Sequence, residues 1–529
     1  MRKTTIRDIW TSFEENPQEV VKKHVKLGGR VFTERGNETL RFIELTDGST
    51  IRTIQCVCDR KKYPTQPWDD LWTHVKRGST LSLYGKLITS PAKGQPIELS
   101  VESFKLWGTI PEDYQLASRG KIGRDLLRTI PHIRPHTKLF TAIQIIKQTV
   151  YKAFHDSMED LGIGEVQPTL ITGNECESGA FPFSVTTLLK DSISDISVKE
   201  KTDIVDFSKD FFGKKVYLTV SSQLHLEATV CGTGRDGYVM TTAFRAEPSK
   251  GPLHLAEFLM PEWELVDCGL EGNMFVAQKS LQHCFKQVLE KCKYELEYLE
   301  EYRIKDLESQ LLKDQYEHKK KRGDMQKKDW VALKKEMYKA HEEKKSRPSL
   351  LDRLEKYIKN DFVITTHEDC VRLMLKDIED GKVEFLEAPG YGDDFSKQHE
   401  RYITEQLHGG SPVFVTQYPK KIKAFYMPVV DKGSEVEHVD CYDLLFPYVG
   451  EVVGGSQRVH DHDHLVERMD ELGMDKESLQ WYLDLRKYGS VPHGGAGLGF
   501  GRLFLVITDI FNIKDMQEFP RGYGGICHA

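Results

Sequence analysis

The stretch Val491-Pro-His-Gly-Gly-Ala-Gly-Leu-Gly-Phe-Gly-Arg-Leu503, near the carboxyl end, decides the fold. Glycine recurs at every second position and then gives way to one arginine and an apolar run. Because alternate glycines leave one face of a strand bare, Gly495, Gly497 and Gly499 would let a flat ligand lie against the backbone. Arg502 follows where we expect a helix to begin, so its planar guanidinium can cover a nucleotide held on that strand. These residues alone are equally compatible with a glycine-rich core strand that binds nothing.

A second segment, much earlier in the chain, favours the interpretation that the glycine stretch binds a nucleotide. It reads Phe244-Arg-Ala-Glu247 and, after a short loop, His254-Leu-Ala-Glu-Phe258. With the glycine stretch, this segment resembles motifs 2 and 3 of the class II aminoacyl-tRNA synthetases. Other matches narrow the resemblance to the asparaginyl-tRNA synthetases, and they include Arg134-Pro-His-Thr137, Leu218–Glu227, Lys423-Ala-Phe-Tyr-Met427, Val449–Arg458 and Trp481-Tyr-Leu-Asp-Leu-Arg486. The resemblance covers nearly the whole chain outside one insertion.

Composition sets broad limits on the class of protein. The 529 residues predict two or three domains, and 29% charged with 39% hydrophobic residues is typical of a soluble enzyme. We find no apolar run of the ~20 residues that span a bilayer, and no signal peptide. Ten scattered cysteines predict reduced thiols and a cytoplasmic location. A net charge of −7 argues against a general nucleic-acid binder, so any RNA surface must concentrate its basic residues locally.

The order of elements predicts an α+β protein. Residues 1–115 contain five short β-branched runs separated by turn signals, which predicts an OB-fold barrel. The resemblance implies that this barrel binds the anticodon. Residues 116–137 are predicted to be a linker. Residues 138–529 should form the class II catalytic domain, which the resemblance implies is an antiparallel β-sheet flanked by helices.

A charged insertion is predicted at about residues 303–347, where 15 Lys/Arg accompany 9 Asp/Glu. It includes the run His318-Lys-Lys-Lys-Arg322, and we expect two charged helices broken near Gly323. Either the insertion is a solvated hairpin without a binding role, or it is a basic arm that contacts a phosphate backbone.

The resemblance implies ATP and Mg²⁺ as cofactors and assigns residues to each. Arg245 and Arg502 would be the catalytic arginines on the phosphate and on the base. Asp443 and Glu451 would hold Mg²⁺, which prefers carboxylate and phosphate oxygens. The full ATP set is Arg245, Glu247, His254, Phe258, Glu451 and Arg502.

For the amino acid, the resemblance assigns four residues, Glu177, Gln223, Glu227 and Arg458. Aspartyl relatives carry a lysine, on a strand after the matching glutamine, that binds the substrate carboxylate. Here Leu226 takes the place of that lysine and Glu227 follows it. An aspartate would lose a cation and meet an anion, whereas asparagine could donate to Glu227 and accept from Arg458. The sequence therefore predicts asparagine over aspartate.

The remaining implied partners are tRNA(Asn) and a second copy of the chain. Phe42 and Gln55 match barrel residues that stack on and hydrogen-bond the central anticodon base, although Phe42 could instead belong to the barrel core. Pro168 matches the motif 1 proline of a homodimer interface.

Three departures from the family pattern keep other interpretations open. Leu253 stands where an arginine usually precedes His254, and Gly501 replaces an acidic residue beside Arg502. Glycine is also common at Ser178 and Ser222. An aspartyl enzyme or a non-catalytic relative are the alternatives. His460–His464 could suggest a metal site, but its position favours a solvated helix start with acidic residues at the positive end.

Overall fold

The computed structural model describes residues 4–92, 94–116, 122–173, 181–189, 198–199, 204–321 and 346–526. The chain divides into two compact units, each considered separately below. One unit comprises Met1–Gln148 with Cys292–Tyr302, and the other comprises Thr149–Lys291 with Arg303–Ala529.

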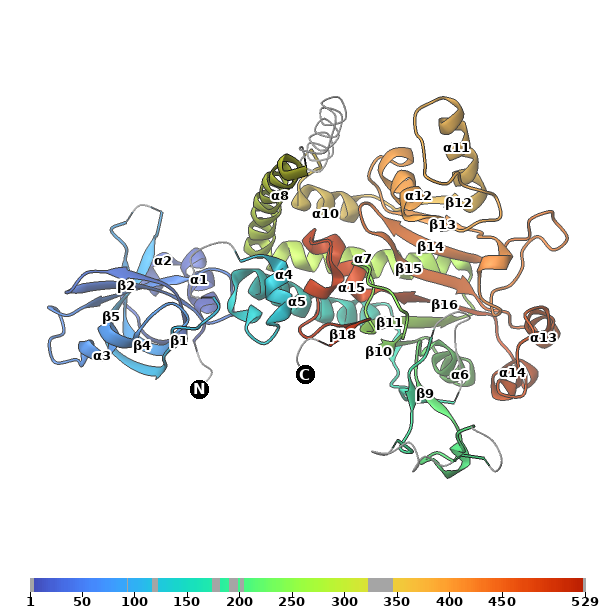
Figure 1. Cartoon of the computed structure of the whole chain (residues 1–529), viewed down its shortest axis with the longest axis horizontal. Helices are drawn as coiled ribbons and strands as arrows, with labels where there is room; N and C mark the ends of the chain where they lie inside the picture. The colour runs from blue at the N-terminus through green and yellow to red at the C-terminus, as the bar shows by residue number, and fades with distance from the viewer. Residues whose placement is uncertain are drawn as a thin grey trace. The chain divides into compact units, whose positions relative to one another are not determined.

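The first unit contains a closed five-stranded barrel with strand order β1-β2-β3-β5-β4, drawn in blue in Figure 1. The expected OB-type barrel is therefore confirmed, with α3 preceding the fourth strand. Its elements are α1 (Ile6–Glu15), α2 (Pro17–Val20), β1 (His24–Gly36), β2 (Leu40–Thr46), β3 (Ile54–Asp59), α3 (Trp68–His74), β4 (Thr80–Thr89) and β5 (Ile97–Gly108).

The interior of the barrel follows from period-2 alternation along its strands. On β2, Ile43 and Leu45 are fully buried and belong to the core. Phe42 precedes Ile43 and so points to the opposite, outer face, where its partner on β3 is Val57. Gly85 is required where β4 bulges, because a Cβ there would lie 2.1 Å from the carbonyl oxygen of Ser100.

The second unit is built on an eight-stranded sheet of order β12-β13-β14-β15-β16-β11-β10-β6. All neighbours are antiparallel except the two outermost pairs, β12 with β13 and β10 with β6. This sheet confirms the predicted α+β class. Its strands are β6 (Gly164–Glu165), β10 (Gly237–Phe244), β11 (Glu257–Val266), β12 (Val363–Thr366), β13 (Val413–Thr416), β14 (Cys441–Phe446), β15 (Gly450–Gln457) and β16 (His493–Leu498).

Helices flank this sheet, as expected. Helix α7 packs on β15 and β16, α6 packs on β10 and β11, and α15 packs on β11 and β15. A small separate sheet has the order β7-β9-β8, from Ile171–Thr172, Val216–Leu218 and Ser184–Val185. Helix α4 (Arg124–Thr129) belongs to the first unit. The remaining described helices are α5 (Lys138–Asp160), α6 (Gln223–Thr233), α7 (Leu270–Lys291), α8 (Lys293–Lys321), α10 (Leu350–Lys359), α11 (His367–Glu379), α12 (Lys397–Tyr402), α13 (His462–Glu471), α14 (Gln480–Lys487) and α15 (Phe500–Thr508).

The stretch from Gln223 to Glu227, expected as part of a strand, is instead the first turn of α6. The buried carboxylate of Glu262 causes this start. It accepts hydrogen bonds from the hydroxyl of Ser221 and, at 2.8 Å, from the backbone N–H of Ser222. An acidic group beside exposed N–H donors stabilises a helix N-terminus. Successive side chains therefore project about 100° apart instead of alternating.

The described part of the insertion is the continuation of α8 to Lys321, and the predicted break near Gly323 lies outside the described residues. The insertion is anchored at its beginning, because Nε of Arg303 lies 3.1 Å from Oδ2 of Asp509. Arg353, beyond its end, reaches the same oxygen at 2.9 Å. Asp509 ends α15 in the left-handed conformation, with φ of 56°.

Two further expectations can be compared with the described residues. The histidine-rich stretch after Arg458 does start a helix, because Asp461 caps α13 by accepting the N–H of His464 at 2.8 Å. Among the helices described, none combines the length and the apolar character that crossing a membrane requires.

Candidate active site

A cavity of about 400 Å³ opens on one face of the large sheet. It is lined by β11, β14, β15 and β16, by the first turns of α6 and α15, and by the loop after β10. Gly497 and Gly499 line it, as the glycine pattern predicts. Gly495 lies further along β16 and does not line it, because Glu264 covers that position: a Cβ would lie 2.0 Å from its Oε2.

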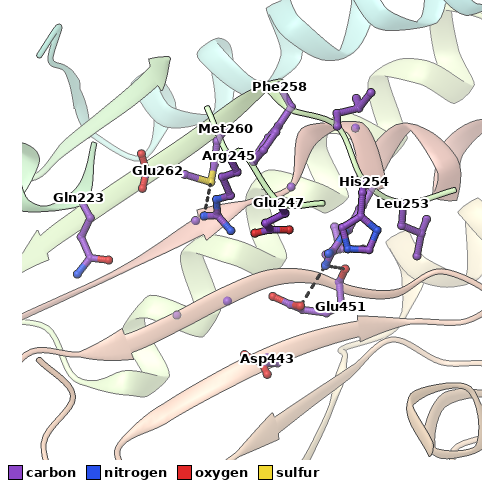
Figure 2. A pocket seen from close by; sticks show the side chains of 18 of the residues that line it. Gln223, Arg245, Glu247, Leu253, His254, Phe258, Met260, Glu262, Asp443 and Glu451 are labelled. Atoms are coloured by element: carbon purple, nitrogen blue, oxygen red, sulfur yellow. Dashed lines mark hydrogen bonds and ion pairs between the residues drawn. The ribbon is translucent and has the colours of Figure 1, made fainter. Parts of the chain in front are cut away.

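The structure brings most of the predicted residues together in this cavity (Figure 2). The predicted residues that line it are Gln223, Arg245, Glu247, His254, Phe258, Asp443, Glu451, Arg458 and Arg502. Glu227 lies behind this lining, in contact with Gln223 and Arg458. Glu177 lies outside the described residues. Pro168 is partly buried on the segment that follows β6.

Arg245 lies beside an aromatic ring, just beyond the end of β10. Its guanidinium carbon is 5.6 Å from the ring centre of Phe258 on β11. The backbone carbonyl of Val220 accepts from Nε and Nη2 of Arg245, both at 3.4 Å. Figure 2 shows Arg245 and Glu247 pointing into the same space, with Gln223 and His254 on opposite sides of the view. The arrangement offers a cation and a flat apolar surface to one ligand.

Leu253 also lines the cavity, next to His254, at the position where the resemblance would place an arginine. Lys250 is a nearby cation in the same loop, but it does not line the cavity and so does not take the place of that arginine. Gly501 has a packing reason, since a Cβ there would come within 2.6 Å of Cδ1 of Ile513.

Arg502 and Glu451 form an ion pair across the cavity wall. Nη1 of Arg502, in the first turn of α15, lies 3.0 Å from Oε2 of Glu451 and donates to the Glu451 carbonyl at 2.9 Å. The low-polarity surroundings raise the pKa of Glu451, but Arg502 and Lys423 lower it more, to about 2. Glu451 is therefore ionised at neutral pH, and its side chain remains 39% exposed to the cavity.

Asp443 is the second carboxylate at this place, and Lys423 neutralises it. Nζ of Lys423 lies 2.7 Å from Oδ2 of Asp443. Burial raises the pKa of Asp443, Lys423 lowers it and Glu451 raises it again, so it stays above its ordinary value. The two acids converge on one point, because a Cβ on Gly454 would lie 3.4 Å from Oε1 of Glu451 and 3.6 Å from Oδ1 of Asp443.

This pair fits a magnesium ion that is shared with phosphate oxygens. Mg²⁺ is usually held by one or two carboxylates plus substrate phosphates and water, not by a complete protein cage. Among the described residues, no group of three or more His, Cys, Asp or Glu side chains is placed to hold a metal. Asp443 and Glu451 would thus bind Mg²⁺ together with a nucleotide.

At the other end of the cavity, Glu227 is fully buried among charged partners. Its Oε1 accepts from Nε2 of Gln223 at 2.9 Å and lies 3.7 Å from Nε of Arg458. Burial raises the pKa of Glu227, but Arg486, His493 and Arg458 lower it further, well below its ordinary range. The carboxylate is therefore ionised and acts only as an acceptor.

Leu226, on which the choice of asparagine partly rested, does not line the cavity. It is fully buried against Val230 and Val239. The cause is the helix, since neighbouring side chains on α6 point about 100° apart and only Glu227 faces Arg458. The argument for asparagine therefore rests on Glu227.

Arg458 is fixed by a glutamate that sequence reasoning missed. Its Nη2 lies 2.9 Å from Oε2 of Glu264, and its Nη1 donates to Oγ of Ser456 at 2.7 Å. Burial raises the pKa of Glu264, and although Arg458 lowers it, the pKa stays above its ordinary value beside Glu227. Lys423, Arg486 and His493 were also missed as members of the site, although all three lie in motifs quoted from the sequence.

On the barrel, Phe42 and Gln55 lie close together on the outer face of β2 and β3. Arg35 connects them: its guanidinium carbon is 5.7 Å from the Phe42 ring centre, and Nη2 donates to Oε1 of Gln55 at 3.2 Å. Gln55 also donates to Glu98 at 3.0 Å. Phe42 is not part of the barrel core, which removes the alternative interpretation of that residue.

Comparisons with known proteins match both parts of the chain. Residues 131–522 match the family model for class II tRNA synthetases (D, K and N), and residues 25–107 match the model for OB-fold nucleic acid binding domains. The chain is 34% identical over 503 residues to an asparagine–tRNA ligase of Porphyromonas gingivalis, covering 95% of each.

This chain belongs to the asparaginyl-tRNA synthetase family. An Arabidopsis thaliana member, described as chloroplastic/mitochondrial, is 35% identical, over 95% of this chain and 80% of its own length. Among solved structures, an asparaginyl-tRNA synthetase of Pyrococcus horikoshii complexed with asparaginyl-adenylate superposes with a TM-score of 0.76 at 26% identity, over 99% of each chain. Membership in the asparaginyl-tRNA synthetase family confirms the resemblance drawn from the motifs.

Proposed function

We propose that this chain joins asparagine to ATP, forming asparaginyl-adenylate and pyrophosphate, and then transfers asparagine to the 3′ end of tRNA(Asn) with release of AMP. The observation that carries the proposal is the position of the ionised Glu227 beside Arg458, at one end of a cavity whose other end holds Arg245, Phe258 and Arg502. The first end suits an amide side chain, and the second suits a nucleotide.

Positioning and charge neutralisation would supply most of the catalysis. Arg245 would bind the α-phosphate, where its forked donors match the charge that develops on phosphorus. Phe258 and Arg502 would enclose the adenine, with Glu247 near its edge and His254 towards the outer phosphates. The carboxylate of asparagine would then attack the α-phosphorus while pyrophosphate leaves on the opposite side.

Asp443 and Glu451 would hold Mg²⁺ against the phosphates. When bound, the ion supplies positive charge to the phosphate oxygens. Lys423 and Arg502 already compensate the two carboxylates, so the pair of acids is not a concentration of uncompensated negative charge.

Selection of asparagine would come from Glu227 and Arg458. The side-chain amide can donate to Oε1 of Glu227 and accept from the guanidinium of Arg458. Aspartate offers acceptors only and would place a second carboxylate beside a buried anion, which costs much more than the loss of one hydrogen bond. Gln223, and Glu177 by its motif match, would receive the α-ammonium group.

The barrel would read the anticodon through Phe42 and Gln55, with the base stacked on the half-buried ring of Phe42. Pro168 would lie at the interface of a homodimer, and the charged insertion near residues 303–347 would contact tRNA. A cytoplasmic location is part of the proposal and agrees with the ten scattered cysteines of the chain. Sedimentation equilibrium tests the dimer directly, and a monomer at micromolar concentration contradicts it.

Asparagine-dependent exchange of radioactive pyrophosphate into ATP tests the activation step without any tRNA. We expect exchange with asparagine and Mg²⁺ and almost none with aspartate. Exchange that is equal for the two amino acids would contradict the proposed selection, and absence of exchange with both would favour the non-catalytic alternative.

A further inference from the structure

The carboxylate of Glu227 is held mainly by residues that do not line the cavity. Its Oε2 accepts from the hydroxyl of Tyr482 at 2.6 Å and from Nη2 of Arg486 at 2.8 Å, and Nε2 of His493 lies 3.2 Å away. All four side chains are at most 5% exposed. One oxygen of Glu227 is therefore saturated with partners.

The other oxygen, Oε1, faces the opposite way. Its neighbours are Nε2 of Gln223 and Nε of Arg458, and both of those residues line the cavity. The two oxygens thus have separate surroundings, one anchored in the protein and one facing residues in contact with the ligand space.

The anchor comes from α14. Tyr482 and Arg486 are one helical turn apart, so their side chains lie on the same face. Arg486 is itself braced, because its Nε donates to the carbonyl of Val459 at 2.9 Å and its Nη2 also reaches the Tyr482 hydroxyl at 2.9 Å. The planar guanidinium of Arg486 is thus bonded both to the backbone and to Glu227, and it fixes the carboxylate more firmly than the flexible ammonium group of a lysine would.

We propose that Arg486 is a positioning residue for the choice of amino acid: by holding Oε2 of Glu227, it turns the ionised Oε1 towards the side-chain amide of asparagine. This inference rests on the proposed activation of asparagine and adds α14, which lies outside the cavity lining, to the elements that set its specificity.

The proposal predicts a pH dependence that a purely structural arginine would not produce. Burial raises the pKa of Glu227, and Arg486 is the strongest influence that lowers it. Without Arg486 the pKa rises, and a protonated Glu227 can donate to a substrate carboxylate. Aspartate is then rejected less strongly as the pH falls. The titratable or charged groups around Glu227 are Tyr482 and Arg486 of α14, His493 of β16, Arg458 after β15, Glu264 of β11 and Cys231 of α6.

The test compares Arg486→Met with Arg486→Lys in the full-length chain. Pyrophosphate exchange is measured with asparagine and with aspartate between about pH 6 and pH 8. We expect Arg486→Met to raise the KM for asparagine about tenfold or more, with a smaller change in kcat and in the KM for ATP. The ratio of asparagine to aspartate activation should shrink, most at the acid end. Arg486→Lys should recover part of the ratio, because it keeps the charge.

Arg468→Met is the matched control, because Arg468 is also a buried arginine, 3% exposed and paired with Glu471 on α13, but does not contact Glu227. It should leave the KM for asparagine and the amino-acid ratio unchanged. If thermal melting shows that Arg486→Met does not fold, Tyr482→Phe decides, since it removes one donor to Oε2 without changing the shape of the ring. It should raise the KM for asparagine about threefold or more.

The outcomes separate this inference from the function on which it rests. A wild-type chain without asparagine-dependent exchange overturns the proposed function and the inference with it. A wild-type chain that exchanges, with a folded Arg486→Met or Tyr482→Phe variant that keeps the KM and the amino-acid ratio, overturns the inference alone. The inference is also overturned if Arg468→Met lowers the ratio of asparagine to aspartate activation as much as Arg486→Met does.

Discussion

Nζ of Lys423 lies 2.7 Å from Oδ2 of Asp443, so one of the two converging carboxylates is paired with a cation that comes from a loop outside the strand pair. Arg502 pairs with the other, Glu451, at 3.0 Å. Two carboxylates and two cations leave the pair of acids with no excess charge to attract a metal. Mg²⁺ should therefore arrive with ATP, whose phosphates supply the missing negative charge.

The first prediction is that Mg²⁺ alone binds with a dissociation constant weaker than about 1 mM, as expected of a pair without further ligands. In the presence of ATP, Asp443→Asn should raise the Mg²⁺ concentration for half-maximal pyrophosphate exchange about fivefold or more, since a carboxylate ligand is removed. Isothermal titration measures the first quantity and a Mg²⁺ titration of exchange the second. Asp440→Asn is the control, because Asp440 does not line the cavity. Tight binding of Mg²⁺ without ATP would contradict the inference that Lys423 and Arg502 neutralise Asp443 and Glu451.

The second prediction concerns Glu227→Gln. The wild-type chain should reject aspartate by ~10³ or more, as sites built around one polar group do. The variant loses the carboxylate that accepts from the asparagine amide, so asparagine activation should fall at least about tenfold. Its new amide can donate to the carboxylate of aspartate, so the preference for asparagine over aspartate should become smaller. The KM for ATP provides the internal control, since it should not change. An unchanged preference would exclude Glu227 as the residue that distinguishes the two amino acids.

The third prediction separates the barrel from the chemistry. Phe42→Ala should leave pyrophosphate exchange unchanged and weaken tRNA binding roughly tenfold, because stacking on one aromatic ring contributes ~1–3 kcal/mol. Tyr84→Ala is the control, since Tyr84 is an exposed aromatic residue, 41% accessible, on another strand of the same barrel. Filter binding with tRNA(Asn) measures the affinity. Equal losses in both variants would argue against a specific role for Phe42.

The fourth prediction concerns the charged insertion. Residues 308–345 should be replaced by a short Gly/Ser linker, which keeps Arg303 on Asp509 and Arg347 on the ring of Tyr448, 3.8 Å from its centre. Asparagine activation should not change. The slope of log affinity for tRNA against log salt should become shallower by roughly 0.7–0.9 for each tRNA phosphate that the shortened chain no longer neutralises.

A full-length control for the same prediction changes Lys319, Lys320, Lys321 and Arg322 to Gln. It keeps the length of the insertion and removes only charge. If both variants keep the wild-type salt slope, the insertion is a solvated hairpin without an RNA-binding role.

Much of the site could be predicted because the motifs are local. Arg245, Phe258, Glu451 and Arg502 each lie within a short run whose residue types suit one task, and all four line one cavity. The barrel was equally predictable, since alternation and turn residues are readable over a few positions. In these cases the residues on which the prediction depends are close to one another in the sequence.

The remainder depends on interactions between distant positions. Glu227 and Arg486 are 259 residues apart, and nothing near either one indicates that they form an ion pair. The start of α6 at Gln223 depends on Glu262, which lies on a different strand, so the local run Thr219-Val-Ser-Ser-Gln-Leu resembled a strand. Buried charges need partners, but sequence alone does not say which ones.

Asp509 has a consequence for how the chain can vary. One carboxylate receives Arg303, where the insertion begins, and Arg353, shortly after it ends. The backbone of the same residue ends α15, the helix that carries Arg502 in its first turn. Arg303 and Arg353 contact the same carboxylate, so the two ends of the insertion are held close together. Lengthening a loop whose ends are already close costs little additional entropy. A change in the length of this stretch should therefore cost little stability, and a foreign domain grafted between residues 321 and 346 should leave the nucleotide end of the cavity undisturbed.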